Sequence, residues 1–138
     1  MTDDATLTRI LSETRRIALV GASMNPARAS NRVGHFLASK GYEVIPVNPG
    51  HVGKSLFGQT VVASLSDIEG QIDMVDIFRR SEAVLPVVED ALDALEGLQT
   101  VWMQLGVENA EARSLAEARG LTVVENRCPA IDFPRLIG

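Results

Sequence analysis

Cysteine is nearly absent from this sequence: Cys128 is the only one in 138 residues, so no disulfide can form within the chain. No apolar run approaches the roughly 18 residues that a membrane-spanning helix needs. The first ten residues, MTDDATLTRI, contain no basic segment followed by an apolar stretch, which a secretory signal would require. We therefore expect a cytoplasmic protein without a membrane partner.

Basic residues are also too few for a protein whose main partner is a nucleic acid. The 13 Lys and Arg are outnumbered by 18 Asp and Glu, which gives a formal net charge of -5, whereas a phosphate backbone attracts a positive surface. We expect His35 on a helix surface and His51 in a turn, neither of them beside a cysteine or carboxylate cluster at metal-ligand spacing. We predict no nucleic-acid partner and no metal site, and expect a local group of residues to hold any bound anion.

Length and composition favour one globular domain. The chain lies within the range of roughly 100–200 residues that is usual for a single domain. Its 46% hydrophobic and 22% charged residues differ from the polar, highly charged composition of disordered proteins. We expect a single domain over residues 1–138, in which residues 1–15 form a helical extension at the N-terminus.

Apolar runs of strand length alternate with helical patterns along the chain. Three helices are predicted: one capped by Ser30 and ended by Gly41, one beginning at Pro86, and one running from Asn109 to Arg119. Residues 51–71 predict at most one helical turn. The predicted strands are residues 17–20, 42–47, 72–78, 100–105 and 121–124.

These strands are predicted to be buried on both faces, and most of them are separated by helices. This pattern is typical of an α/β fold with a doubly wound, five-stranded parallel sheet in three layers. Ligands of such folds bind outside the carboxyl ends of the strands, where the strand order switches, and we expect that point beside the first strand. The candidate segments are residues 21–23, 47–49, 77–80, 104–106 and 126–128.

The first of these segments has the features of a phosphate-binding loop. Gly21 permits a tight turn, Ala22 and Ser23 are small enough for close approach, and the following helix directs free N–H groups at the loop. Only the first glycine of the G-x-G-x-x-G pattern is present, so a glycine retained for packing is the alternative interpretation.

The second strand ends in Val47-Asn48-Pro49, where an NAD-binding domain usually has a carboxylate for the ribose hydroxyls. A ligand with an additional phosphate therefore fits better than NAD. Of the cations in the nearby loops, we expect Arg28 and Arg79 to contact the ligand, and Arg32 and Arg80 to be solvated.

Two other groups near the strand ends have competing interpretations. Trp102 and Met103 are expected in the core rather than against a substrate. Cys128 is either a small buried hydrophobe or a thiol that meets a ligand.

Five segments, IALVGAS, GYEVIPVNP, VDIFRR, WMQLGV and NRCPAIDF, occur in the order and spacing of the small bacterial CoA-binding proteins of the YccU type. The sequence resembles that family over nearly its whole length, and VDIFRR with WMQLG is the specific part of the resemblance. It implies a Rossmann-like CoA-binding domain, similar to the N-terminal domain of the succinyl-CoA synthetase α subunit. The catalytic half of that synthetase has no counterpart in this chain.

The resemblance also implies a ligand site, for coenzyme A or an acyl-CoA. It assigns the diphosphate to Gly21, Ala22 and Ser23, with Arg28 and Ser30 beside it and Lys54 as a weaker phosphate contact. It assigns the adenosine to the space between two segments, Val47, Asn48 and Pro49 on one side and Ile77, Phe78 and Arg79 on the other.

Where the family commonly has a Lys after the Cys-Pro pair, this chain has Ala130. We expect a binding protein without established catalytic activity and assign no catalytic residue. Two alternatives stay open: an enzyme that uses NADP or an acyl-CoA, and a redox protein in which Cys128 forms a mixed disulfide with CoA. No protein partner is indicated.

Overall fold

The predicted parallel sheet is present in the computed structural model, which describes residues 2–138. Its strands lie in the order β2-β1-β5-β6-β7, and every neighbouring pair is parallel. The strand order switches beside β1, as expected for a doubly wound sheet, and the fold class is confirmed. The strands are β1 (Arg16–Val20), β2 (Glu43–Val47), β5 (Met74–Ile77), β6 (Thr100–Met103) and β7 (Thr122–Val124).

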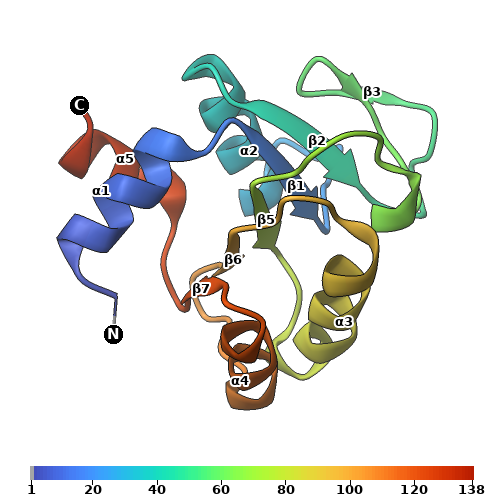
Figure 1. Cartoon of the computed structure of the whole chain (residues 1–138). Coiled ribbons are helices and arrows are strands. Elements are labelled where there is room, and N and C mark those ends of the chain that lie inside the picture. The colour runs from blue at the N-terminus through green and yellow to red at the C-terminus, as the bar shows by residue number, and fades with distance from the viewer. Residues whose placement is uncertain (1) are drawn as a thin grey trace.

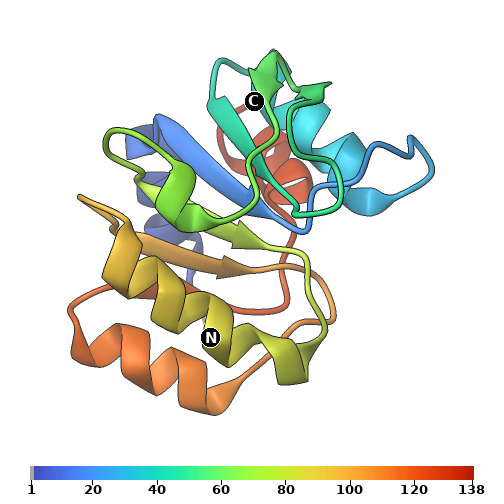
Figure 2. The same ribbon diagram turned by 90° about the vertical axis from the view of Figure 1, so that its right-hand side faces the viewer.

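Helices cover both faces of this sheet and give the fold three layers (Figure 1). One face packs against α1 (Asp4–Glu13), α2 (Ala29–Ser39) and α5 (Pro129–Leu136). The other face packs against α3 (Val84–Ala94) and α4 (Ala110–Ala118), which lie side by side in Figure 2.

Alternation along the central strand explains why both faces are apolar. In β1, Ile17 and Leu19 belong to the core beneath α1, α2 and α5, whereas Ala18 and Val20 belong to the core beneath α3 and α4. Successive strand side chains point to opposite faces, so a strand covered on both sides must be apolar at every position. Trp102 is fully buried, as predicted, and its indole N–H donates to the Arg127 carbonyl over 2.8 Å.

The predicted cap of α2 was wrong, whereas that of α4 was right. The Asn109 side chain accepts the N–H of Ala112 over 2.9 Å, as expected of a helix cap. In α2, however, Arg28 occupies the N-cap position and makes no side-chain capping bond, and Ser30 lies buried in the first helical turn. The Asn25 side chain accepts the N–H of Ala27 in the turn before the helix, and α2 begins two residues earlier than a cap at Ser30 would place it.

The segment for which no strand was predicted contains a small hairpin beside β2. Its strands, β3 (Ser55–Leu56) and β4 (Gln59–Thr60), are joined by Phe57 and Gly58, both with positive φ. A short 3-10 helix, η1 (Leu65–Asp67), follows, with Ser64 and Asp67 forming its capping box. Two-residue strands lack the periodicity from which a strand is predicted.

Helix α5 was not predicted, and α3 begins two residues before the predicted start. The 3-10 helix η2 (Ser81–Ala83) leads directly into α3, so Pro86 falls inside its first turn, where a missing N–H is tolerated. The tail after β7 forms α5 and packs beside α1, so the first and last helices of the fold lie side by side (Figure 1). Bidentate bonds of 3.0 Å from Arg135 to Asp4 join the two helices.

Candidate functional site

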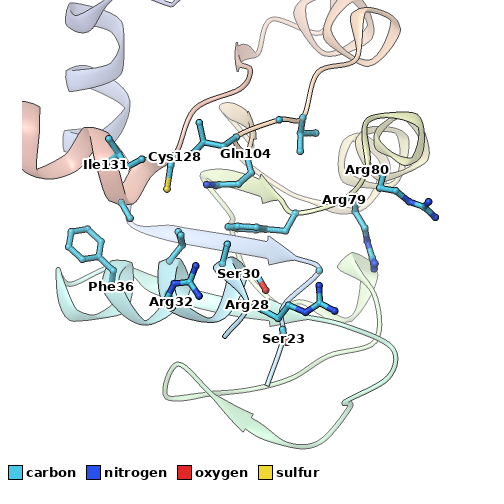
Figure 3. A pocket seen from close by; sticks show the side chains of 18 of the residues that line it. Ser23, Arg28, Ser30, Arg32, Phe36, Arg79, Arg80, Gln104, Cys128 and Ile131 are labelled. Atoms are coloured by element: carbon cyan, nitrogen blue, oxygen red, sulfur yellow. The ribbon is translucent and has the colours of Figure 1, made fainter. Parts of the chain in front are cut away.

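A cavity of about 1030 Å³ lies at the carboxyl ends of the central strands, between α2 and α5 (Figure 3). Ligand cavities commonly span roughly 300–1,000 Å³, and open α/β sheets bind ligands at this position. The lining residues come from the loops after β1, β2, β5 and β6, from α2 and from the start of α5: Gly21, Ser23, Arg28, Ala29, Ser30, Arg32, Val33, Phe36, Asn48, Phe78, Arg79, Arg80, Gln104, Leu105, Gly106, Val107, Cys128, Ala130 and Ile131.

Some of the residues expected to contact the ligand line this cavity and some do not. Those that line it are Gly21, Ser23, Arg28, Ser30, Asn48, Phe78 and Arg79. Among the others, Ala22, Val47 and Ile77 are buried behind the lining, while Pro49 and Lys54 are exposed outside it. Their direct contact with a ligand stays a prediction.

Gly21 is needed for packing, independently of any ligand. Its φ is +90°, and a Cβ atom there would lie 2.3 Å from the Phe78 carbonyl oxygen. The N–H groups of Gly21 and Ala22 both donate to the Val47 carbonyl, over 3.0 and 3.3 Å. Since these two N–H groups are already used, a phosphate in the cavity must find other donors, such as the N–H groups of Ala29 and Ser30, for which a helix start provides no intrahelical acceptor.

Four arginines supply positive charge to the cavity. Arg80 forms an exposed ion pair with Glu82 at 3.6 Å, and Arg32 donates to the Ala27 carbonyl over 2.6 Å. Within residues 2–138, no carboxylate forms an ion pair with Arg28 or Arg79. Arg32 and Arg80 were predicted to be solvated, and they are exposed, yet they also line the cavity.

The opposite end of the cavity is mostly apolar, although Arg32 lies there on α2, one helical turn before Phe36 (Figure 3). Val33 and Phe36 of α2 face Cys128, Ala130 and Ile131 at the start of α5. Figure 3 shows Phe36, Cys128 and Ile131 on the far side of the cavity from the guanidinium groups of Arg28 and Arg79. The arrangement suits an elongated ligand that is anionic at one end and uncharged at the other.

Gln104 lies between the two ends. Its side chain is 5% exposed, and its Oε1 atom has no hydrogen-bond partner. A buried amide oxygen without a partner costs free energy, and such groups are rare in folded proteins. An amide at this position is therefore a candidate contact for a polar group of the ligand.

Asp76 of β5 is a second buried polar residue without a partner. It is fully buried, neither carboxylate oxygen accepts a hydrogen bond, and burial raises its pKa well above the usual range. It lies beside Trp102 in the sheet register, on the face that also carries Gln104. Asp76 does not line the cavity, and its burial favours the protonated form.

An ion-pair network holds α5 in place beneath the cavity. Arg127 donates two bonds to Asp132, of 2.8 and 3.0 Å, and Arg135 adds a third of 3.1 Å. Burial raises the pKa of Asp132, but the hydrogen bonds from Arg127 and Arg135 outweigh it and lower the pKa overall. The charge of Arg127 is thus engaged by Asp132 rather than directed at Cys128.

The sequence reasoning missed most of the apolar end. Ile131 was not proposed as a site residue because the tail was not recognised as a helix, although Pro129 at its first turn is a helix-start signal. Pro134 inside the same segment argued against one. Val33 and Phe36 belong to the predicted helix α2, where apolar side chains are expected to pack against the sheet. Asp76 carried no signal beyond its place in an apolar strand run.

Two further observations concern residues 2–138. No set of three or more His, Cys, Asp or Glu side chains in this part of the chain is grouped as a metal ion would need. Of the helices formed there, none has the length and apolar character to span a membrane.

Comparisons with known proteins agree with this fold. A family model described as a CoA binding domain matches residues 15–134. The uncharacterized protein YneT of Bacillus subtilis is 40% identical over 124 residues, which cover 90% of this chain and 89% of that protein. A solved structure from Thermus thermophilus is similar with a TM-score of 0.92 at 34% identity, over 99% of this chain and 100% of the other.

A larger enzyme contains a similar domain. The dinucleotide-forming acetyl-coenzyme A synthetase 1 of Ca. Korarchaeum cryptofilum, solved with phosphate and ADP, matches with a TM-score of 0.68 at 27% identity. The match covers 85% of this chain and 26% of that one. This chain therefore corresponds to one domain of the larger protein.

Proposed function

Because the chain belongs to the CoA-binding domain family, we propose that its cavity binds coenzyme A, as the free thiol or as an acyl-CoA. The observation that carries this proposal is the division of one cavity into two ends. The cationic end has Arg28 and Arg79, which form no ion pair within residues 2–138, and the mostly apolar end lies between α2 and α5. Coenzyme A has the same division, because its phosphates lie on the nucleotide and its pantetheine arm is uncharged.

The cationic end suits the phosphates. Arg28 and Arg79 approach it from the loops after β1 and β5 (Figure 3), and charge-assisted hydrogen bonds to phosphate are among the strongest in proteins. The first turn of α2 adds N–H donors at Ala29 and Ser30. Since the N–H groups of Gly21 and Ala22 are used within the fold, we assign the diphosphate to α2 and the arginines.

The adenosine is assigned to the space between the ends of β2 and β5. Asn48 is held rigidly there: its Nδ2 donates to the Ala22 carbonyl over 2.7 Å, and its Oδ1 accepts the Gly50 N–H over 2.8 Å. Phe78 and Arg79 line the opposite side. No carboxylate lies among the lining residues to repel a phosphorylated ribose.

A binding role is favoured over catalysis by the chemistry of the lining. It contains arginines and one thiol but no Asp, Glu or His, the residues that most often act as general acid and base. We therefore propose a module that holds CoA and assign it no reaction.

Isothermal titration calorimetry tests the proposal. CoA should bind, and Arg79→Ala should weaken binding roughly ten- to a hundredfold, because losing a charge-assisted hydrogen bond costs about 1.5–3 kcal/mol. Arg119→Ala is the matched control, since Arg119 is an exposed arginine at the end of α4 and does not line the cavity. Binding of NADP with no binding of CoA would contradict the proposal and favour the oxidoreductase alternative.

The group on the thiol needs a separate measurement. Native mass spectrometry of the purified protein should show a bound species with the mass of CoA or of one acyl-CoA. A protein that binds neither form would contradict both versions of the proposal.

A further inference from the structure

A free thiol lies at the apolar end of the cavity. Cys128 is the N-cap residue of α5, is 6% exposed and lines the cavity. In Figure 3 its sulfur lies between α2 and α5, on the opposite side of the cavity from Arg79 and Arg80. A lone buried cysteine usually serves as a small hydrophobe, so its position alone does not define a site.

Gln104, which lies between the two ends of the cavity, is an independent indication that a ligand extends toward Cys128. Its side chain is more than nine-tenths buried, its Oε1 atom has no partner, and it extends into the same space as Cys128 (Figure 3). Buried amides normally find partners within the fold. The pantetheine arm carries two amide groups, which are the chemistry that would satisfy an unpartnered glutamine side chain.

The direction of the ligand follows from the proposed function, on which this inference rests. If the phosphates of CoA lie at Arg28 and Arg79, the arm must run toward α5, and the thiol at its end approaches Cys128. We infer that Cys128 forms a mixed disulfide with CoA by thiol–disulfide exchange, with CoA disulfide as the co-reactant.

The exchange balances without any further oxidant. The Cys128 thiolate attacks one sulfur of CoA disulfide, a new S–S bond forms between Cys128 and that CoA, and the original S–S bond breaks. The second CoA leaves as a thiolate and takes up the proton that Cys128 lost. Cys128 is oxidised, and one of the two CoA sulfurs is reduced.

Two features of the site support this step. Cys128 stands at the start of α5, and helix N-termini stabilise negative charge on adjacent groups. Leu105 and Ile131, which line the cavity, are 54% and 57% exposed, so the departing CoA has an open path to solvent. Arg127 does not contribute, because its guanidinium is bound to Asp132.

The adduct would hold CoA covalently under oxidising conditions and release it on reduction. The test is intact-mass spectrometry of the folded chain incubated with CoA disulfide. We expect one adduct, equal in mass to CoA less two hydrogen atoms, that dithiothreitol removes and that Cys128→Ser does not form. The reaction should be at least about tenfold faster than with hydroxyethyl disulfide, which lacks the nucleotide, because anchoring raises the effective concentration of the disulfide.

Variants and a second reagent distinguish a site that binds CoA disulfide from a thiol that reacts with any disulfide. Arg79→Ala should slow the reaction with CoA disulfide, whereas Arg119→Ala should not. An adduct on the denatured chain but none on the folded chain would overturn the inference. Equal rates with both disulfides, unaffected by Arg79→Ala, would also overturn it.

Calorimetry with reduced CoA on the wild-type chain distinguishes a failure of the disulfide inference from a failure of the proposed function. If CoA binds and no adduct forms, the disulfide inference fails and the proposed function stands. If CoA does not bind, the proposed function itself fails.

Discussion

Asp76 allows a sharp test of how burial acts on a carboxyl group in this fold. It is fully enclosed in β5 beside Trp102, and neither oxygen has a hydrogen-bond partner. Burial raises its pKa well above the usual value of 3.8. The folded chain therefore keeps a proton on Asp76 at pH values where the unfolded chain has already lost it.

The sign of the pH dependence follows from this difference. Below the unfolded pKa, both states carry the proton and Asp76 has no pH-dependent effect. As the pH rises above that value, the unfolded state releases its proton and gains stability relative to the folded state. The loss of stability grows by about 1.4 kcal/mol for each pH unit until the pH reaches the raised pKa of the folded state.

The substitution Asp76→Asn removes the titrating group and keeps the shape of the side chain. We expect the stability of the variant relative to the wild type to increase by about 1.4 kcal/mol per pH unit above pH 4, until the pH reaches the raised pKa of Asp76 in the folded chain. At lower pH the two proteins should differ by a constant amount, because both carry a neutral group at this position. Other titrating groups are present in both chains and cancel in the comparison.

Urea unfolding followed by the fluorescence of Trp102 measures both stabilities at a series of pH values from 3.5 to about 7. Trp102 is the only tryptophan and is fully buried next to Asp76, so its signal reports directly on this part of the core. A difference between the two proteins that stays constant over this range would refute the argument from burial.

Three further predictions concern two loop glycines, the site and α5. Gly53→Ala should lower the free energy of unfolding in urea by about 1–2 kcal/mol, because the φ of Gly53 is +87° and an added Cβ would meet no atom within 4 Å. Gly21→Ala should lower it by more, because the φ of Gly21 is +90° and the added Cβ would lie 2.3 Å from the Phe78 carbonyl oxygen. Equal losses in the two variants would contradict the steric argument. CoA at a hundred times its Kd should add about 2.7 kcal/mol and raise the Tm on the order of 10 °C, and a shift with NADP but none with CoA would count against the proposed ligand. Asp132→Asn should lower the stability of the fold at neutral pH, because the pKa of Asp132 is depressed in the folded chain, and this loss should fade as the pH falls through that pKa. A loss of equal size at every pH would show that the ion pairs of Asp132 do not cause the loss of stability.

The strands and their parallel pairing were predictable because the information is local. Runs such as 17–20 and 100–103 are apolar at every position, and such runs occur where a sheet is covered on both sides. The place of the site was predictable for a related reason. The carboxyl ends of parallel strands meet at one edge, so residues 21–23 and 78–79 were expected to converge before any contact was known.

The start of α2, the hairpin at residues 55–60 and helix α5 were not predictable in the same way. The Asn25 side chain bonds within the turn before α2, and the two-residue strands of the hairpin are too short for periodicity, while only Val62 beyond them bridges to Val47 of β2. Helix α5 contains Pro134, which disfavours a helix locally. Contacts between Arg135 and Asp4, 131 residues apart in the chain, help to hold it in place.

The chemical state of the buried groups depends on distant parts of the chain. The sequence MVDI alone does not indicate whether its carboxyl group is solvated. Asp76 is cut off from water and from hydrogen-bond partners only because strands lie on either side of it and helices cover it. The same holds for Gln104, which follows β6, and for Cys128 at the start of α5, since both line one cavity only in the folded chain. Hydrophobic patterning acts between near neighbours and determined the elements, whereas desolvation is a sum over all surrounding atoms and was settled only when those elements packed together.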